Sequence, residues 1–121
     1  MKKLLITLLL ISPFSFADWG DVYYCKMTNN VGITLEGVRT NYKLEKFTFK
    51  LDKTKNAMVF GKKGYFANTE TKLVEGMSYP SQEKWNAEGD YDRLVFKEGK
   101  FIYSWTGRSG ITTMSADCEK F

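Results

Sequence analysis

Short segments of alternating apolar and polar residues recur along most of the chain. The clearest is 46–51 (KFTFKL), whose two phenylalanines and leucine would face one side and whose polar residues would face the other. A period of two residues indicates a strand with one buried face. The turn-forming stretch 52–56 (DKTKN) separates this segment from 57–60 (AMVF). The two segments therefore predict a hairpin, and 61–64 (GKKG) predicts the next turn.

A second hairpin is predicted near the C-terminus. Residues 94–97 (LVFK) and 100–105 (KFIYSW) flank Glu98-Gly99, and Gly99 can adopt the positive φ that a two-residue turn demands. Phe101, Tyr103 and Trp105 would then share one face. After a turn at 106–110 (TGRSG), 111–118 forms a last strand, in which alternate residues from Thr112 to Cys118 share one side.

The start of the mature region predicts two further strands, at 22–28 and 33–38, separated by a turn at 29–32 (NNVG). Segment 73–79 is a weaker candidate. The total of about seven or eight short strands, without an amphipathic helix, is typical of a small sandwich or barrel. We therefore predict an all-β fold, a small antiparallel β-sandwich or barrel that occupies 18–121 as a single domain.

The N-terminus has the three-part pattern of a secretory signal peptide. Lys2 and Lys3 precede the apolar run 4–11 (LLITLLLI), and the small residues Ser15 and Ala17 stand before Asp18. The run is too short to cross a bilayer, because a spanning helix needs about 20 apolar residues. We predict that 1–17 is a signal peptide cleaved between Ala17 and Asp18. The product would be a bacterial protein that is periplasmic or secreted and does not span the membrane.

Charge changes this picture little. The chain has 121 residues, 18 basic and 14 acidic side chains and a net charge of +4, which would fall to +2 in the 104 residues left after cleavage. Such a balance argues against nucleic acid as a partner, since that affinity comes from many phosphate contacts. The lysines are dispersed, which favours a solvated face over a patch for an acidic partner. We expect a monomer.

Cys25 and Cys118 are the only cysteines and lie near the two ends of the predicted domain. In an exported protein the economical interpretation is a disulfide between them. Closing so long a loop would remove about 4 to 5 kcal/mol of unfolded-chain entropy in the simple polymer model. The alternative, a reactive or metal-binding thiol pair, lacks a C-x-x-C spacing and a histidine.

The chain contains no histidine, which removes the commonest general base, the usual catalytic triads and most zinc sites. No phosphate loop, nucleophile elbow or dinucleotide fingerprint is present. Four acidic residues gather in 81–92 (SQEKWNAEGDYD), but their spacing does not match an EF-hand, so we interpret the segment as a solvated loop. We expect no enzyme activity, no cofactor and no metal.

Most aromatic residues stand at strand positions where a small β domain needs large core side chains: Phe47, Phe49, Phe60, Phe96, Phe101 and Tyr103. Trp85 and Tyr91 instead lie in the polar stretch 81–92, and exposed aromatic residues of loops are frequent contact residues. They form a candidate binding surface, with Arg108 in the TGRSG turn as a weaker member. The competing interpretation is that Trp85 folds back and caps the domain.

Three hypotheses follow. The first is a non-enzymatic domain that binds a protein or another component of the cell envelope. The second is a small-molecule carrier, because an eight-stranded barrel can enclose one apolar ligand. The third is a glycan hydrolase that uses two carboxylates, which requires a pair of acids about 5 to 10 Å apart in one cleft.

Overall fold

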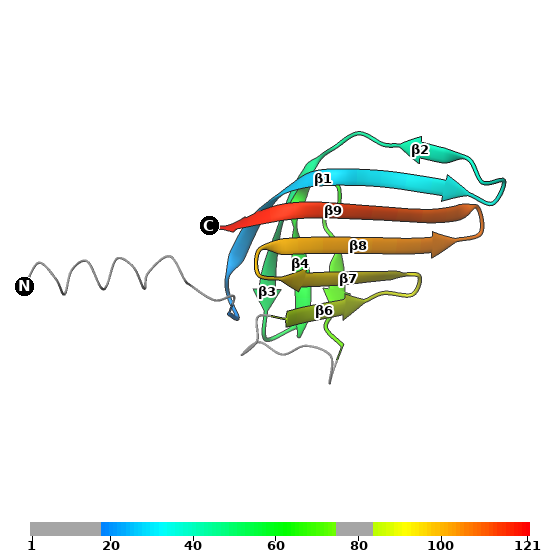
Figure 1. Ribbon diagram of the computed structural model, residues 1–121. Helices are drawn as coiled ribbons and strands as arrows, with labels where there is room; N and C mark the ends of the chain where they lie inside the picture. The colour runs from blue at the N-terminus through cyan, green and yellow to red at the C-terminus, as the bar shows by residue number, and fades with distance from the viewer. Residues whose placement is uncertain (1–17, 75–83) are drawn as a thin grey trace, which may run out of the picture.

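The computed structural model describes residues 18–74 and 84–121. The predicted leader 1–17, with Ala17 of the cleavage site, lies outside the described residues, as do residues 75–79 of the weaker strand candidate. The described chain forms one antiparallel sheet of nine strands (Figure 1). These are β1 (Val22–Thr34), β2 (Arg39–Asn41), β3 (Lys46–Asp52), β4 (Ala57–Gly64), β5 (Glu70–Lys72), β6 (Lys84–Glu88), β7 (Asp92–Lys97), β8 (Lys100–Gly107) and β9 (Gly110–Lys120).

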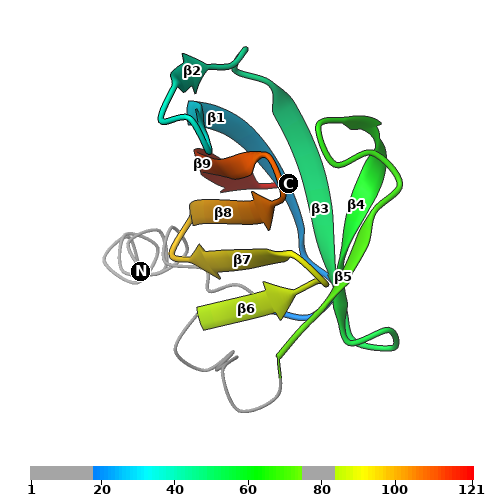
Figure 2. The same ribbon diagram turned by 90° about the vertical axis from the view of Figure 1, so that its right-hand side faces the viewer.

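Eight of the strands form a nearly closed barrel in the order β5-β4-β3-β1-β9-β8-β7-β6, and β2 pairs with the far end of β1. Figure 2 shows the sheet curling round until its two edges meet. Where they meet, Leu73 forms a bridge with Ala87, and the amide of Val74 donates to the carbonyl of Asn86 at 2.8 Å. The two edge strands are therefore joined at this point, which nearly closes the barrel. The all-β prediction is confirmed, and the architecture is the barrel.

The two hairpins with the clearest alternation form as predicted. β3 pairs with β4, and β7 pairs with β8 through a turn in which Glu98 and Gly99 have φ of 50° and 78°. The predicted turn at 61–64 is wrong, because these residues continue β4 and the chain reverses after Gly64. Glycines and lysines signal a turn in sequence, yet here they form the exposed end of an otherwise buried strand.

The predicted turn at 29–32 is also wrong, since β1 runs without interruption from Val22 to Thr34. A bulge between Met27 and Asn29 inserts one extra residue, Thr28, against β9. A bulge places two successive side chains on the same side of a strand. Inward positions therefore shift from odd to even numbers, and Asn30 is buried beyond the bulge as Met27 is before it.

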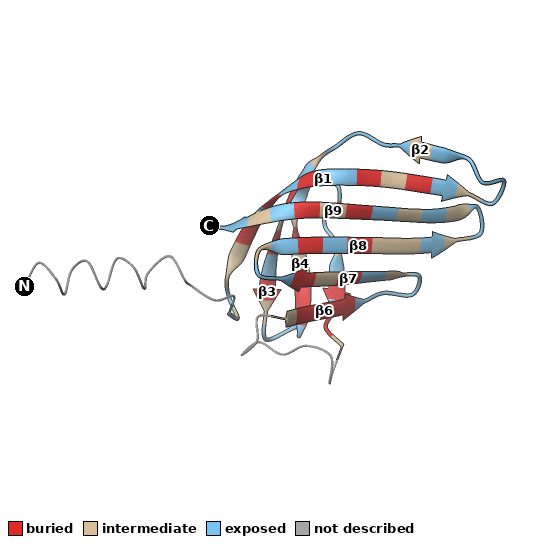
Figure 3. Ribbon diagram, in the orientation of Figure 1, coloured by how far each residue is buried: buried red, intermediate tan, exposed pale blue. Residues whose placement is uncertain are grey.

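An aromatic core fills the barrel. Figure 3 shows in red the buried positions along the strands that contribute to it. All six aromatic residues that the alternation assigns to the core are buried: Phe47, Phe49, Phe60, Phe96, Phe101 and Tyr103. The ring of Phe49 alone contacts four others, with centroid distances from 5.1 Å to Phe96 up to 5.8 Å to Phe60. Side chains therefore occupy the space in which the carrier hypothesis would place an apolar ligand.

The predicted disulfide is confirmed. Cys25 in β1 and Cys118 in β9 are directly opposite in the ladder, with a Cα–Cα distance of 4.0 Å, and they are bonded to each other across 93 residues. No free cysteine remains in the described residues. A structural disulfide is typical of proteins in an oxidising compartment.

Candidate functional site

The residues proposed from sequence as a binding surface lie in different environments. Trp85 is completely buried in β6, and its indole meets that of Trp19 edge-on, at 5.0 Å between centroids. The interpretation of Trp85 as a surface contact residue is therefore wrong, and it belongs to the core. The segment 81–92 is likewise not one loop, because its described part contains β6, in which three successive residues are buried.

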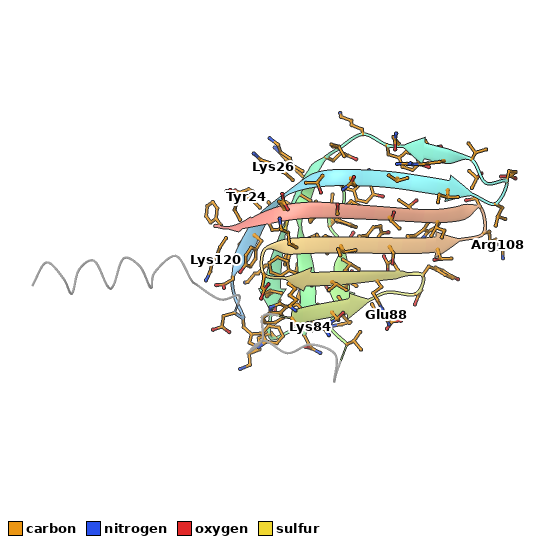
Figure 4. All side chains as sticks on the ribbon, in the orientation of Figure 1. Tyr24, Lys26, Lys84, Glu88, Arg108 and Lys120 are labelled. Atoms are coloured by element: carbon orange, nitrogen blue, oxygen red, sulfur yellow. A yellow bond between two sulfur atoms is a disulfide. The ribbon has the colours of Figure 1, made fainter. Side chains whose placement is uncertain are left out.

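Tyr91 and Arg108 are exposed at the tips of neighbouring hairpins. Tyr91 is 71% exposed in the β6–β7 turn, and its carbonyl accepts a hydrogen bond from the amide of Thr106 at 3.0 Å. It lines an open hollow of about 470 Å³ together with Glu88, Asp90, Asp92, Arg93 and parts of β8. Arg108, in the β8–β9 turn, is not among the residues that line it (Figure 4).

A second hollow lies at the end of the barrel where β1 extends past its bulge. It measures about 300 Å³ and is lined by Asn30, Tyr42, Lys43, Glu45, Tyr65 and Thr112. We call it the tyrosine hollow. Its residues come from β1, from β9, from the β2–β3 connection and from the turn after β4. Its volume is at the lower end of the range that small-ligand sites occupy.

Backbone features of β1 build this hollow. The bulge turns Asn30 inward, and two residues later Gly32 leaves room for the ring of Tyr42. A Cβ at position 32 would stand 2.6 Å from Cε2 of Tyr42, so only glycine permits this close approach. The amide of Tyr42 also donates to the carbonyl of Asn30 at 2.7 Å, which holds the β2–β3 connection against β1.

The side chain of Asn30 is the distinctive polar group of the tyrosine hollow. It is only 4% exposed, and its Nδ2 donates to the carbonyl of Lys43 at 3.0 Å. Its Oδ1 is buried and has no hydrogen-bond partner among the described residues. Leaving a buried amide oxygen unpaired costs about 1 to 3 kcal/mol. Asn30 lines the hollow, and its enclosed oxygen is an acceptor that a donor group of a ligand reaches only after the surrounding side chains shift.

The hydroxyls of Tyr65, which lines this hollow, and of the neighbouring Tyr103 have a raised pKa and are held in the neutral form. Burial raises the pKa of Tyr65, and Glu45 and Tyr42 raise it further. The pKa of Tyr103, whose ring lies 6.2 Å from that of Tyr65, is raised strongly by burial and additionally by Asp92. Neutral phenols both donate and accept hydrogen bonds and present apolar ring faces.

The described residues contain no group of three or more His, Cys, Asp or Glu side chains arranged to hold a metal ion. Among the same residues, no helix is long and apolar enough to cross a bilayer. Glu88, one of the acids beside Tyr91, is paired with Arg93 at 3.5 Å between Oε2 and Nη2.

Comparison with known proteins found no matching family model, no similar curated protein and no similar solved structure. The function must therefore be argued from the residues themselves.

Sequence reasoning missed Asn30 because an Asn-Asn-Val-Gly stretch predicts a turn. The available signal was the alternation of Tyr23, Cys25 and Met27, which continues at Asn30 and Gly32 once a single residue is skipped. A bulge cannot be distinguished from a turn without knowing which strand pairs with the segment.

Proposed function

We propose that this protein is an exported, non-enzymatic binding domain of the periplasm or cell exterior. In this proposal the tyrosine hollow receives a hydrogen-bond-donating group of a protein or another envelope component. The disulfide and the signal-like N-terminus support export. The observation that carries the binding role is the buried, unpartnered Oδ1 of Asn30, a residue that lines an open hollow.

The chemistry of the hollow favours a neutral, polar group. The amide oxygen of Asn30 accepts a hydrogen bond, Tyr42 and Tyr65 offer ring faces and hydroxyls, and Lys43 and Glu45 contribute one charge of each sign. Balanced charges favour neither a strongly anionic nor a strongly cationic ligand. An amide or a hydroxyl of a peptide or glycan fits these requirements.

The test is retention of envelope components on the immobilised protein, with Asn30→Leu as the diagnostic variant. Leucine removes the acceptor with little change in volume, so retention should fall about tenfold, the effect of losing one or two hydrogen bonds. Thr113→Val is the matched control, because Thr113 is exposed on the outer face of β9 opposite Val31. Equal retention by both variants would refute the role of the hollow.

Loss of folding must be separated from loss of binding. Asn30→Leu also removes the donor to the Lys43 carbonyl, so its thermal unfolding is to be measured alongside. Tyr65→Phe provides a milder change, since it keeps the ring and removes one hydroxyl from the rim. Reduced retention by a normally folded Tyr65→Phe variant supports the hollow independently.

A further inference from the structure

The fold collects lysines that are dispersed in sequence. Six strands are neighbours in the barrel in the order β3-β1-β9-β8-β7-β6. One residue of each stands directly opposite a residue of the next strand, in the same order: Lys46, Lys26, Asp117, Lys100, Lys97 and Lys84. Five of the six are lysines. We call this set the lysine row. It crosses the sheet at right angles to the strands, and Figure 4 shows Lys26 and Lys84 at its upper and lower parts.

The lysine row is exposed and faces outward. Lys26, Lys46, Lys97 and Lys100 are all exposed, and each alternates with a buried residue of the core. Lys84, at the end of the row, is half-buried and makes other contacts, so the argument depends on the remaining four. Because neighbouring strands are about 4.8 Å apart, the row extends for about 24 Å over the surface.

This arrangement costs stability in the isolated protein. Like charges placed directly opposite on neighbouring strands destabilise a sheet, and the four exposed lysines of the row form two such pairs: Lys46 with Lys26, and Lys100 with Lys97. The one acidic residue in the row, Asp117, bonds to Lys100 at 2.6 Å. Two further acids, Glu98 in the β7–β8 turn and Glu119 on β9, flank the row. The five lysines still outnumber these three acidic residues, so positive charge remains in excess.

The positive surface continues past Lys46. An open hollow of about 440 Å³ on the outside of β3 and β4 is lined by Tyr24, Lys46, Lys62 and Lys63, together with Phe47, Thr48 and Gly64. Three lysine side chains and an exposed tyrosine ring therefore border this hollow. Cations beside an aromatic face are suited to an anionic group carried on a ring or sugar.

The curvature of the barrel selects among polyanions. The row follows six strands of a nearly closed sheet, whose curvature Figure 2 shows, and its exposed lysines lie on the outside of that curve. A flat anionic membrane could contact only part of such an arc. A flexible chain with acidic groups at regular intervals can follow all of it. We propose that the lysine row binds a linear acidic polysaccharide, through its carboxylate or sulfate groups.

The test compares dextran sulfate and polygalacturonate with phosphatidylglycerol vesicles as probes of the full-length protein. The diagnostic variant is Lys26→Gln/Lys97→Gln, and the matched control is Arg39→Gln/Lys53→Gln, which removes two exposed cations outside the row. Loss of two ion contacts should weaken polysaccharide binding about tenfold at low salt and reduce its salt dependence. The control should change binding less than about twofold.

Three outcomes would overturn the proposal: equal effects of the two double variants, polysaccharide affinity independent of salt, or binding to vesicles in preference to both polysaccharides. Lys26→Arg/Lys97→Arg keeps the charges and should retain binding, which separates charge loss from misfolding. Because the lysine row and the tyrosine hollow share no residue, Asn30→Leu should leave polysaccharide binding unchanged. The two proposals can therefore fail separately.

Discussion

Trp85 and Tyr91 come from the same polar stretch of sequence, yet the fold gives them opposite environments. The ring of Trp85 is enclosed in the core against Trp19, whereas Tyr91 is 71% exposed at a hairpin tip. Burial, and not residue type, decides what each side chain contributes to stability. The two residues thus provide a matched pair of substitutions.

We predict that Trp85→Ala lowers the free energy of unfolding by about 3 to 5 kcal/mol, the usual cost of emptying a large aromatic site. Tyr91→Ala should change it by no more than about 0.5 kcal/mol, because an exposed ring loses few contacts on truncation. Urea unfolding of the two variants measures both values. A large loss in Tyr91→Ala or a small one in Trp85→Ala would show that the core is assigned wrongly.

Tyr103 makes stability depend on pH in the alkaline range. Burial, with Asp92 and Tyr65, raises its pKa above the ordinary value of 10.0. Above that pH the unfolded chain releases the phenolic proton while the folded protein retains it, so the free energy of unfolding falls as pH rises. Below it, both states are protonated and Tyr103 has no such effect.

Tyr103→Phe should therefore show a shallower loss of melting temperature than the unchanged protein as pH rises above about 10. For each protein, the melting temperature is compared with its own value at neutral pH, which removes any constant difference in stability between the two. Parallel curves would mean that the hydroxyl of Tyr103 titrates alike in the folded and unfolded states.

At the scale of the elements, strict alternation identified strands whose two faces differ in environment. β3, β7, β8 and most of β9 bury one face, and their positions and hairpins follow from sequence. The position of β6 could not be predicted from sequence, because Trp85, Asn86 and Ala87 are all buried and leave no alternation to detect. The residues around the β1 bulge (NNVG) and the end of β4 (GKKG) have the composition of turns. They are strands because they pair with β9 and β3, and local sequence does not reveal that pairing.

The tyrosine hollow could not be predicted either, because it depends on which strands pair. Its residues belong to segments far apart in sequence, which the sheet brings to one end of the barrel. The lysine row likewise depends on register across six strands. Local patterning reveals which face a lysine occupies, but not which lysine stands opposite.

The bulge in β1 leads to a contrast between two deletions. Removing Thr28 would convert the bulged strand into a regular one and keep Asn30 inward, so the barrel should fold and retain the tyrosine hollow. Removing Val31 would turn the residues after it to the opposite face, moving Gly32 outward from beneath Tyr42 and Ile33 inward.

Amide hydrogen exchange along β1 and β9 measures this difference. Protection of the paired amides should persist when Thr28 is deleted and should be lost beyond residue 30 when Val31 is deleted. Similar protection in the two variants would contradict the assigned register.

The whole molecule depends on the covalent link between its first and last long strands. β1 and β9 already pair along most of their length, and the Cys25–Cys118 bond holds them together across 93 residues. Cys25→Ala/Cys118→Ala should therefore lower the free energy of unfolding by about 4 kcal/mol, chiefly by freeing the unfolded chain. Chemical unfolding with and without the substitutions measures the loss, and a change below about 1 kcal/mol would contradict this account of the stability.

The central claim is that the tyrosine hollow of an exported domain is a binding site. Its most direct test places a benzophenone amino acid at Tyr65, on the rim, in the cell that makes the protein. Illumination should join the protein to an extracytoplasmic component, and Asn30→Leu should abolish that product. The same probe at Ile102, exposed on the outer face of β8, should not form it. An identical product from Ile102, or no product from Tyr65, would contradict the claim.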